Sequence, residues 1–535
     1  MKPETLEIHG YKKIDDVIRR IEAWLATDSK GMLGYPASAC SERIAQKIAA
    51  EVTPLFLQES VRQYVGGKEC FPSDAGQFTC GGLKIDTQTG EVKPAAGLVL
   101  RSAMSFVLLW LAVLGAWSMA LATGRRHLPC VLLTGVPEAD LTVQGNDERF
   151  ARFCRHGTLD VLANAKGLVV QAVNKINATC PDEIRYARYP LLAVFSCCRQ
   201  DVAQSLFFLK RHVAALIAYF HGLWLQPVYC LLWRDLAEHA AAAALNDGHL
   251  IDAIVITNSN WLQQLLWTSD LRDRRFKTYM ALYSLNSSTL VYKDDPVSYT
   301  HPGIRHLRVD EIWVWNEAYR KVLDTEEVSP QSRAVGPILW YLPESRSASG
   351  SRREPTLCVF DVNPISSGYA IAAADTRFRY YSARNAVKFV EDIFHARDRA
   401  AAFLGGRIHI VLKHKRTTIQ GHDAGYFEHL DRIISARADV TRAPSDANVY
   451  SLIADSILAI VPPYSSPAYV AGFLGIPAIY YDASGKLLPA FAEEPMISFI
   501  GDREPLCGAV LRVAERALLH REPDDRAIAR PWMST

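Results

Sequence analysis

The chain of 535 residues is too long for one hydrophobic core and predicts two or three domains. Its 59 Lys and Arg residues against 57 Asp and Glu residues give a formal net charge of +2, which supplies no global field for nucleic acid. The 11 cysteines include no C-x-x-C pair, which argues against a zinc site or a secreted disulfide framework and indicates a reducing compartment. The first residues lack an apolar run, so we expect no signal peptide.

The N-terminal region, residues 1–100, mixes a helix-like segment, "IDDVIRRIEAWLAT", with a Gly-rich irregular stretch, and we interpret it as an accessory region. It is followed by one long apolar helix within residues 101–127. Its core, residues 102–124, carries no charge and is long enough to cross a bilayer. A central helix buried in a large domain is the alternative. Flanking basic residues and two internal tryptophans favour membrane association, and they leave open whether the helix spans the membrane or lies on it.

Residues 128–341 predict an α/β domain, because strand-like apolar segments alternate with helical ones. The segment "QPVYCLLWRDLAEHAAAAALN" is expected to run from a strand into a helix. The stretch "LPESRSASGSRREP", residues 342–355, is rich in Pro, Ser and Arg and is interpreted as a linker. The remaining strand-like segments of this domain are "PCVLLTGV", "GLVVQAV", "DAIVITNSN", "KTYMALYSLN" and "DEIWV".

Residues 356–520 predict a second α/β domain of Rossmann-like type, followed by a tail at 521–535. Strands and helices alternate here with short connections, which implies a parallel sheet covered on both faces. Ser445 is expected to cap the helix in "DANVYSLIAD". Such sheets bind ligands beyond the carboxyl ends of their strands, so the residues that directly follow each strand are the candidate binding residues.

The segment "VPPYSSPAYVAGFLG" places two serines between a buried strand, "SILAIV", and a helix. Ser466 suits the N-cap of that helix, Pro467 its first turn and Gly475 the residue after its end. One interpretation is that the serines only cap the helix. The other is that Ser465 and Ser466, with the N–H groups of the helix start, bind a phosphate at the ligand-facing edge of the sheet.

A basic cluster occupies the equivalent place after another strand of the same domain, "IHIVLK". It consists of Lys413, His414, Lys415 and Arg416. Charge runs are usually solvated, but the carboxyl end of a parallel strand directs such groups toward the ligand crevice. Together with the serines they would bind a phosphate diester, or a donor sugar that carries its own carboxylate.

These residues resemble the bacterial surface-polysaccharide biosynthesis proteins defined by a Pro-Phe-Thr-Ser motif, over roughly residues 130–500. Here the motif stands as Pro463-Tyr464-Ser465-Ser466, followed by Pro467 and "LGIPAIYYD". The arrangement is similar to GT-B glycosyltransferases that use CMP-activated acidic sugars, namely sialyltransferases and retaining 3-deoxy-manno-octulosonate (Kdo) transferases. Those enzymes bind the CMP phosphate through a serine pair and a Lys-Pro-His-Pro element. The basic cluster of this chain lacks both prolines, which affects the role expected for His414 more than that of Lys413.

The resemblance implies a GT-B-like α/β fold in which two Rossmann-like domains face a cleft, with the acceptor on the N-terminal domain and the nucleotide on the C-terminal one. It implies a glycosyltransferase of capsule, O-antigen or lipopolysaccharide biosynthesis that transfers Kdo or a related acidic sugar from a CMP-linked donor to a glycan or glycolipid. No metal is expected, since the chain has no D-x-D pair. No cofactor beyond the nucleotide-sugar donor is expected, and the small net charge predicts no nucleic-acid partner. The expected location is the cytoplasmic face of the bacterial inner membrane.

Glycosyl transfer needs a carboxylate at the sugar, either as base or as nucleophile. Three places in the N-terminal half offer one. Asp235 follows a predicted strand at a helix start, and we rank it first. Glu148 ranks second, beside Asp147, which a capping role explains equally well. Asp294 ranks third, because a turn before a proline accounts for it.

Acceptor hydroxyls suit amides and phenols at strand ends, and four residues have that position: Asn258, Asn260, Tyr283 and Asn286. Turn formation explains the asparagines nearly as well. Two other functions stay open. A UDP-sugar or polyol-phosphate transferase could share the fold, because phosphate-binding residues do not report the base or the sugar. A non-catalytic polysaccharide assembly subunit could keep the fold and a glycan groove.

Overall fold

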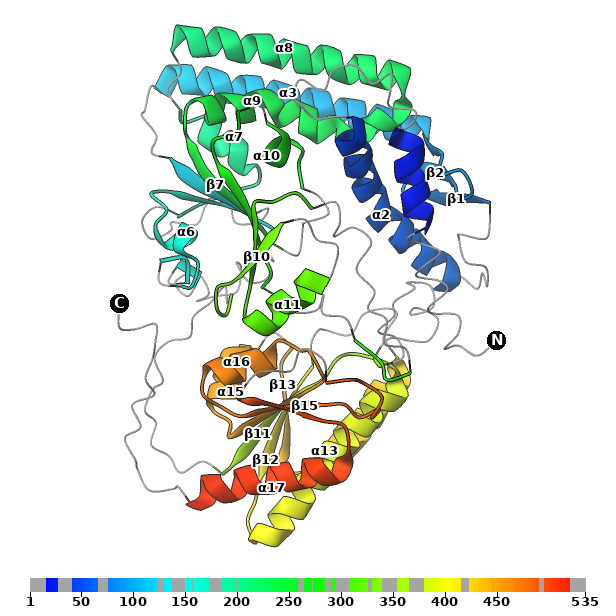
Figure 1. Ribbon diagram of the computed structural model, residues 1–535, viewed down its shortest axis with the longest axis vertical. Helices are drawn as coiled ribbons and strands as arrows, with labels where there is room; N and C mark the ends of the chain where they lie inside the picture. The colour runs from blue at the N-terminus through cyan, green and yellow to red at the C-terminus, as the bar shows by residue number, and fades with distance from the viewer. Residues whose placement is uncertain are drawn as a thin grey trace.

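The computed structural model confirms an α/β protein with two parallel sheets, each flanked by helices (Figure 1). The fold class expected from the sequence, two Rossmann-like units with an added N-terminal region and one long apolar helix, is therefore confirmed. The structure describes residues 16–26, 41–65, 76–123, 129–136, 150–172 without 152 and 156, 184–198, 201–257, 264–283 without 272, 290–294, 307–325, 330–338, 354–364, 380–414, 423–489 without 446, and 495–519.

The first sheet has seven parallel strands in the order β10-β9-β8-β7-β4-β5-β6. Its first strand in the chain, β4, is internal, so the chain builds outward on one side through β5 and β6 and then on the other through β7 to β10. This is the doubly wound arrangement. The strands are β4 Cys130–Thr134, β5 Leu168–Gln171, β6 Ile184–Ala187, β7 Ile251–Thr257, β8 Lys277–Ala281, β9 Glu311–Val314 and β10 Gln331–Ala334.

The helices of this unit differ from the sequence expectation in two places. The segment Pro227–Leu232, expected as a strand, is the 3-10 helix η3, which leads directly into α9. Pro227 has no N–H to donate to a neighbouring strand, and its fixed φ suits the first turn of a helix. The long helix α8, Val202–Leu225, was not anticipated. The other helices are α6 Asp160–Ala163, α7 Pro190–Phe195, α9 Trp233–Asp247, α10 Trp267–Asp270 and α11 Glu317–Thr325.

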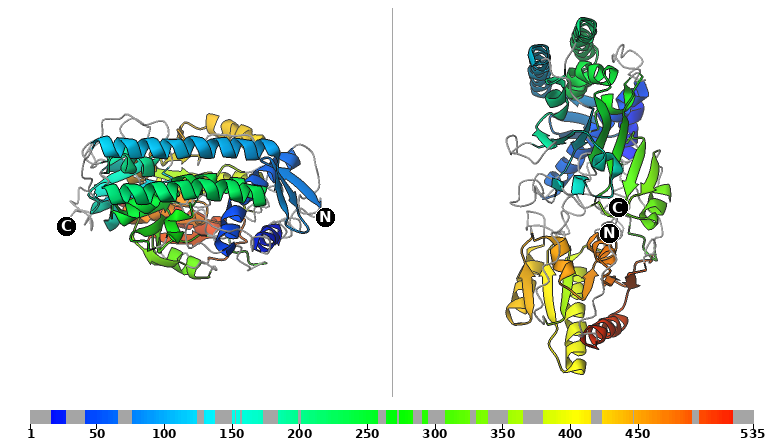
Figure 2. Two further views of the ribbon diagram at one scale, coloured as in Figure 1. Left: turned by 90° about the horizontal axis from the view of Figure 1, so that it is seen from above. Right: turned by 90° about the vertical axis from the view of Figure 1, so that its left-hand side faces the viewer.

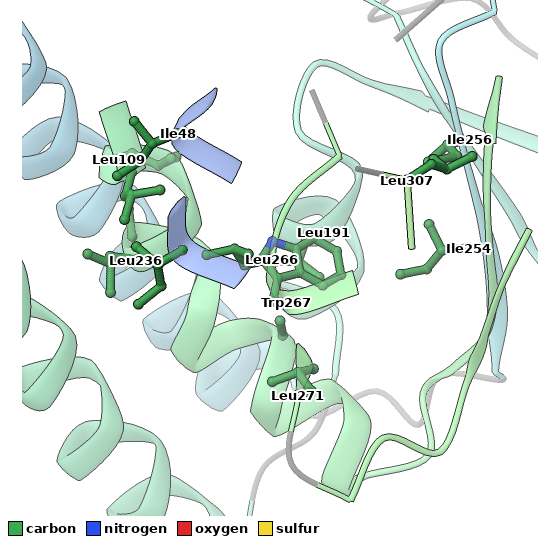
Figure 3. Packing of buried hydrophobic residues seen from close by; sticks show 14 of the residues in the cluster. Ile48, Leu109, Leu191, Leu236, Ile254, Ile256, Leu266, Trp267, Leu271 and Leu307 are labelled. Atoms are coloured by element: carbon green, nitrogen blue, oxygen red, sulfur yellow. The ribbon is translucent and has the colours of Figure 1, made fainter. Parts of the chain in front are cut away.

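The N-terminal region packs into the core of this first unit. Residues 16–26 are helical, and α2 spans Ser41–Val65. Their apolar side chains share one hydrophobic cluster with α3, α9 and the sheet. Figure 3 shows Ile48 of α2 beside Leu109 of α3 and Leu236 of α9. A small antiparallel sheet connects α2 to α3, with strands β1 Gln77–Cys80, β2 Leu83–Asp86 and β3 Val92–Pro94. Residues 1–100 are thus continuous with the first unit in packing.

The expected apolar helix is α3, Ala96–Thr123, and it lies beside α8 on the outside of the first unit (Figure 2). Both helices pack on α9 and on η3. Gly222 of α8 allows this approach, because a side chain there would meet the ring of Tyr229 at 2.3 Å. Only 22% of the most apolar window of α3 is buried. That exposure argues against the alternative of a helix enclosed in the protein core.

The second sheet has six parallel strands in the order β13-β12-β11-β14-β15-β16. The strand order is again doubly wound, with β11 as the first strand in the chain. The strands are β11 Thr356–Phe360, β12 His409–Lys413, β13 Val440–Ala443, β14 Leu458–Val461, β15 Ala478–Tyr481 and β16 Ile497–Ile500. Every residue of β14 and β15 is buried, as expected for strands covered on both faces.

The helices of the second unit begin and end as local capping rules require. Ser382 caps α13 by accepting from the Asn385 N–H, and Gly405 ends it at φ 61°. Helix α15 is capped by Asn448, which accepts from two backbone N–H groups, so the expectation that Ser445 caps it is wrong. The helices are α13 Ala383–Leu404, α14 Ala424–Ser435, α15 Val449–Ala454, α16 Pro467–Phe473 and α17 Arg503–Leu519.

The two units meet at the carboxyl edges of their sheets. Helix α11, which follows β9, and helix α16, which follows β14, both lie toward the boundary (Figure 1). The ring of Trp315, just after β9, meets the ring of Tyr469 in α16 edge-on, with centroids 6.3 Å apart. Nearby, Tyr292 and Leu487 form an antiparallel bridge between the units. The ends of the strands that bind ligands in such sheets therefore face one another.

Candidate functional site

The carboxyl edge of the second sheet contains a pocket at the point where the strand order reverses. Strand β11 lies between β12 and β14, and doubly wound sheets bind ligands outside the strand ends at this position. The pocket is lined by Asp361 after β11, by Pro462 after β14, and by Tyr381, Asn385 and Phe389 beside or within the first turns of α13. Residues that follow β11 and β14 are thus brought together here with the start of α13.

Asp361 and His414 form a buried pair at this edge. Asp361 is the first residue after β11 and His414 the first after β12, and the two strands pair directly. Nδ1 of His414 lies 2.8 Å from Oδ1 and 2.9 Å from Oδ2 of Asp361. Nε2 is buried and has no hydrogen-bond partner among the described residues. The carboxylate therefore orients the imidazole through one nitrogen and leaves the hydrogen-bonding capacity of the other unused.

Tyr426 of α14 completes this group from the helix layer. Its hydroxyl donates to Oδ2 of Asp361. Burial, and then the Asp361 carboxylate, raise the pKa of Tyr426 well above its ordinary value, so the phenol stays protonated and remains a donor. Asp361 therefore accepts from a phenol and an imidazole at once. Neither Asp361 nor Tyr426 was singled out from the sequence, although an aspartate directly after the buried segment "LCVF" is a recognisable signal for this edge.

Lys413 has a bridging role at this edge. The residue is only 5% exposed. Its ammonium group donates to the backbone oxygens of His414 at 3.2 Å and Ser445 at 2.7 Å. These bonds tie the end of β12 to the loop after β13. This bridging role was not predicted from the sequence, and the expected contact of Lys413 with a phosphate stays a prediction. Lys415 and Arg416 lie outside the described residues.

The motif Pro463-Tyr464-Ser465-Ser466 forms a tight turn directly after β14. The N–H of Ser465 donates to the carbonyl of Pro462 at 3.2 Å. Tyr464 has φ 61°, a left-handed conformation that costs a bulky residue energy. The buried tyrosine ring stabilises it, since its hydroxyl donates to the Leu488 carbonyl at 2.9 Å and the ring packs near Tyr480. An aromatic anchor thus holds a backbone conformation that a turn usually assigns to glycine.

The two serines follow this anchored turn. Ser466 occupies the N-cap position of α16 and Pro467 its first turn, but no side-chain capping bond forms. Among the described residues neither hydroxyl makes a hydrogen bond, and both serines are partly exposed. Capping therefore does not explain them. Helix α16 has only seven residues, so its dipole is small. We therefore expect an anion to be bound mainly by hydrogen bonds from the two serine hydroxyls.

Asp235 is enclosed rather than open to a substrate. It lies in the first turn of α9, is 1% exposed, and accepts a hydrogen bond from the Leu266 N–H at 2.6 Å. Burial raises its pKa to about 6, although Lys47 of α2 partly opposes the shift. The predicted strand before it is η3, so the strand-end position that motivated the choice does not exist. The expectation that Asp235 faces the cleft is not met.

The other carboxylate candidates separate into two groups. Glu148 and Asp147 lie outside the described residues, between β4 and the buried Phe150. Asp294 is described and exposed, and it follows the segment that bridges the two units, where the N–H of Lys293 donates to the Lys486 carbonyl at 2.9 Å. Asp294 therefore lies at the end of a segment that connects the two units.

On the acceptor side, the structure describes one of the four predicted residues. Tyr283 lies two residues after β8 and is partly buried at the edge of the cluster that joins the two units. It therefore has the strand-end position that the sequence predicted. Asn258, Asn260 and Asn286 lie outside the described residues.

Within the described ranges, one group of side chains brings three metal-ligating atoms within 4.8 Å of one another: His395, Glu504 and Cys507. It lies between α13 and α17. Glu504 is already paired with Arg399 at 2.6 Å. The nearby guanidinium favours an ion pair over a bound cation, because like charges repel.

A family model described as "Polysaccharide biosynthesis PFTS motif protein" matches residues 212–510, which is more than half of the chain. The match begins within α8 and ends in α17, so it contains the pocket edge and the serine turn. No protein of curated function matches the sequence significantly.

Solved structures give weaker likenesses. Sucrose-phosphate synthase from Thermosynechococcus elongatus is 14% identical, covers 76% of this chain and 92% of its own, and has a TM-score of 0.38. A trehalose 6-phosphate synthase from Burkholderia multivorans is 14% identical, with coverages of 73% and 90% and a TM-score of 0.34. UDP-GlcNAc 2-epimerase from Methanocaldococcus jannaschii is 10% identical, with coverages of 73% and 98% and a TM-score of 0.35. TM-scores this low support no conclusion about activity.

Proposed function

Because the chain belongs to the polysaccharide biosynthesis PFTS motif family, we propose that it is a glycosyltransferase whose nucleotide-sugar donor binds at the carboxyl edge of the β11–β16 sheet. The observation that carries this proposal is the Asp361–His414 pair, in which Nε2 has no partner among the described residues. It lies at the strand-order reversal, at the same sheet edge as the serine turn. Imidazole and hydroxyl groups at one edge suit a phosphate that links a nucleotide to a sugar.

In the proposed reaction, these groups stabilise the phosphate of the leaving nucleotide. An acceptor oxygen attacks the anomeric carbon, the bond from that carbon to the phosphate oxygen breaks, and the nucleotide leaves with the electron pair. Nε2 of His414, when it carries a proton, and the hydroxyls of Ser465 and Ser466 donate hydrogen bonds to the phosphate oxygens as charge develops there. Asp361 fixes the imidazole through Nδ1 and leaves Nε2 for the ligand. We propose that these donors replace a metal, in keeping with the absence of a D-x-D pair from the sequence.

The reaction also needs a carboxylate for the acceptor proton or for attack on the sugar. Since Asp235 is enclosed, we assign this role to Glu148, with Asp147 as its neighbour. Both residues belong to the connection that leaves the carboxyl end of β4, the internal strand of the first sheet, and that returns to the core at Phe150. The carboxyl edge of the first sheet faces the donor-binding edge, which supports this assignment.

For the donor we propose a CMP-linked acidic sugar such as Kdo, and for the acceptor a glycan or glycolipid at the cytoplasmic face of the inner membrane. The support is the motif pattern of a serine pair after β14 and a histidine after β12, the two strands that flank β11. The orientation of His414 by Asp361 supports its proposed role, and Lys413 donates to the Ser445 carbonyl beside it. For the sugar carboxylate we assign Lys415 and Arg416, which follow His414 in the chain.

Calorimetry on the full-length protein tests the donor site. CMP should bind, and the Ser465→Ala/Ser466→Ala variant should bind it at least tenfold more weakly, because two hydrogen bonds to a charged group are lost. Ser435→Ala is the matched control, since its hydroxyl donates to a carbonyl within α14. Binding of UDP or CDP-glycerol in preference to CMP would overturn the donor assignment and favour the other transferases of this fold.

Turnover is tested by incubating the protein with CMP-Kdo and extracted glycolipid and detecting the product by mass spectrometry. Glu148→Gln should lower the rate about a hundredfold or more, the usual scale for removal of a positioned base, while CMP binding persists. Release of CMP without a glycolipid product would contradict the acceptor assignment. CMP binding with no turnover on any glycolipid fraction would favour an assembly subunit that lacks catalysis.

A further inference from the structure

Helices α3 and α8 carry most of the large apolar side chains that the described part of the chain exposes. All but three of these exposed side chains belong to the two helices, and the exceptions are Phe403, Met496 and Leu519. Soluble surfaces rarely gather apolar side chains into one area. The members are Leu100, Met104, Val107, Leu108, Leu111, Met119 and Leu121 on α3 and Val202, Leu206, Phe207, Val213, Ile217, Phe220, Trp224 and Leu225 on α8. We call this set the apolar platform.

The platform is continuous because the two helices join along an aromatic seam. Phe106 of α3 stacks on Tyr219 of α8 with ring centroids 4.0 Å apart, and Trp110 stacks on His212 at 4.2 Å. Residue numbers rise along α3 as they fall along α8, so the helices run antiparallel. The Trp110 indole N–H also donates to the His212 carbonyl at 3.0 Å. Seen from above, both helices lie lengthwise on the same side of the molecule (Figure 2).

The charges on the platform have one sign. Neither α3 nor α8 contains an Asp or Glu residue. Arg101 and Lys210 are exposed on them, whereas Arg211 pairs with Asp247 at 2.5 Å. Trp224, the most exposed member at 86%, is a residue type that favours the headgroup region of bilayers. An apolar surface with only cationic charges complements anionic phospholipids better than a protein partner of mixed charge.

The opposite face of each helix belongs to the protein core. Phe106, Leu109 and Val113 of α3 are buried in the cluster that contains α2 and α9, as are Phe208 and Tyr219 of α8. Helix α3 is long enough to cross a bilayer, at 28 residues. Crossing would require it to leave α9 and expose this buried face to lipid. The packing therefore restricts lipid contact to one side of both helices.

We propose that α3 and α8 together form an in-plane membrane-binding surface that inserts its apolar platform into the interfacial layer of an anionic phospholipid bilayer without spanning it. This extends the membrane association predicted from residues 102–124 to a second helix, and it selects the surface-bound orientation. It does not depend on the transferase activity. The donor-binding edge lies on the second unit, so it stays outside the lipid.

Sedimentation with vesicles tests the surface. Full-length protein should pellet with vesicles of phosphatidylcholine that contain one third phosphatidylglycerol, and more weakly with phosphatidylcholine alone. Phe207→Glu/Ile217→Glu replaces two platform residues that are 62% and 63% exposed, and it should lower the partition coefficient at least tenfold. Phe403→Glu is the matched control, because this residue is 72% exposed on α13, and it should not change binding. Melting temperatures establish that each variant is folded.

The orientation is tested by cysteines at the two ends of α3. Ala96→Cys and Ala122→Cys both replace exposed residues. On sealed vesicles, a membrane-impermeant maleimide should label both positions above the wild-type background, because both ends stay on one side. Labelling of only one end would show a spanning helix and overturn the proposal. It is equally overturned if the platform variant pellets like the wild type, or if it only converts a dimer in solution to a monomer.

Discussion

Asp361 holds His414 through both carboxylate oxygens, with Nδ1 at 2.8 Å from one and 2.9 Å from the other. The pair joins the ends of two adjacent strands, which are 53 residues apart in the chain. Its geometry fixes the orientation of the imidazole ring and leaves Nε2 without a hydrogen-bond partner among the described residues. A carboxylate at the end of the neighbouring strand therefore gives His414 a defined orientation.

We expect Asp361→Asn to weaken CMP binding at least tenfold while the protein stays folded. An amide can accept from Nδ1 with only one atom and presents an N–H group beside the other donor, so the ring loses its fixed orientation. His414→Gln should have an effect of similar size. Calorimetry with CMP measures both. His429→Gln is the control, because that histidine pairs with Glu391 on the exposed surface. Wild-type affinity in both Asp361→Asn and His414→Gln would mean that the pair only stabilises the fold.

Tyr464 should show an unusual order of stabilities upon substitution. Tyr464→Phe loses one hydrogen bond to the Leu488 carbonyl and should cost about 1 kcal/mol of unfolding free energy. Tyr464→Ala removes the buried ring and should cost about 3–5 kcal/mol. Tyr464→Gly removes the same ring but relieves the backbone at φ 61°, so it should be about 1 kcal/mol more stable than Tyr464→Ala. Denaturant unfolding measures the series, and alanine more stable than glycine would show that the turn is not strained.

Much of the second unit could be predicted from its sequence, because its buried strands and amphipathic helices have clear periodicity and short connections. The segments "LCVFDV" and "SILAIV" became β11 and β14, and Gly475 stands at φ 69° just after α16 as its position predicted. The serine turn was located correctly for the same reason. The family predicted from that motif is confirmed.

The roles of Asp235 and Lys413 could not be predicted, because both depend on contacts distant in sequence. Nothing in the segment around Asp235 reveals that Leu266 and Lys47 enclose it. The ammonium group of Lys413 donates to the Ser445 carbonyl, 32 residues away in the chain. Helix α8 was not predicted because Lys210, Arg211 and His212 interrupt its apolar pattern. Tertiary packing decided the positions of Asp235 and Lys413, whereas the local charge pattern obscured α8.

Asp235→Asn should leave turnover and CMP binding unchanged, because the carboxylate is enclosed and the amide keeps an oxygen for the Leu266 N–H. Its stability should change with pH instead. Burial raises the pKa of Asp235 to about 6 in the folded protein, so between pH 3.8 and 6 the folded state holds a proton that the unfolded chain has lost. The wild type therefore loses stability from this group as pH rises through that window.

The variant removes this loss, so its unfolding free energy relative to the wild type should rise from pH 4 to pH 7 by at most about 3 kcal/mol. Denaturant unfolding at the two pH values measures the difference. The Glu238→Gln variant is a control for a neighbouring buried carboxylate that bonds to Arg234 instead. A hundredfold loss of turnover in Asp235→Asn, with normal stability, would restore Asp235 as the catalytic candidate.

The aromatic seam should make the protein sensitive to acid through His212. This ring is stacked between Trp110 and Phe208, and neither ring nitrogen has a hydrogen-bond partner among the described residues. Burial lowers the pKa of His212 to about 4, against 6.5 for an unhindered imidazole. Between pH 6.5 and 4 the unfolded chain therefore binds a proton that the folded protein excludes. The contribution of His212 to stability is complete above pH 6.5 and is lost as the pH falls through this window.

His212→Phe keeps an aromatic ring in the stack and has no proton to bind, so its melting temperature should fall less between pH 7 and pH 5 than that of the wild type. His221→Phe, on the exposed side of α8, should follow the wild type. An equal fall in His212→Phe and wild type would show that the seam admits a charged imidazole.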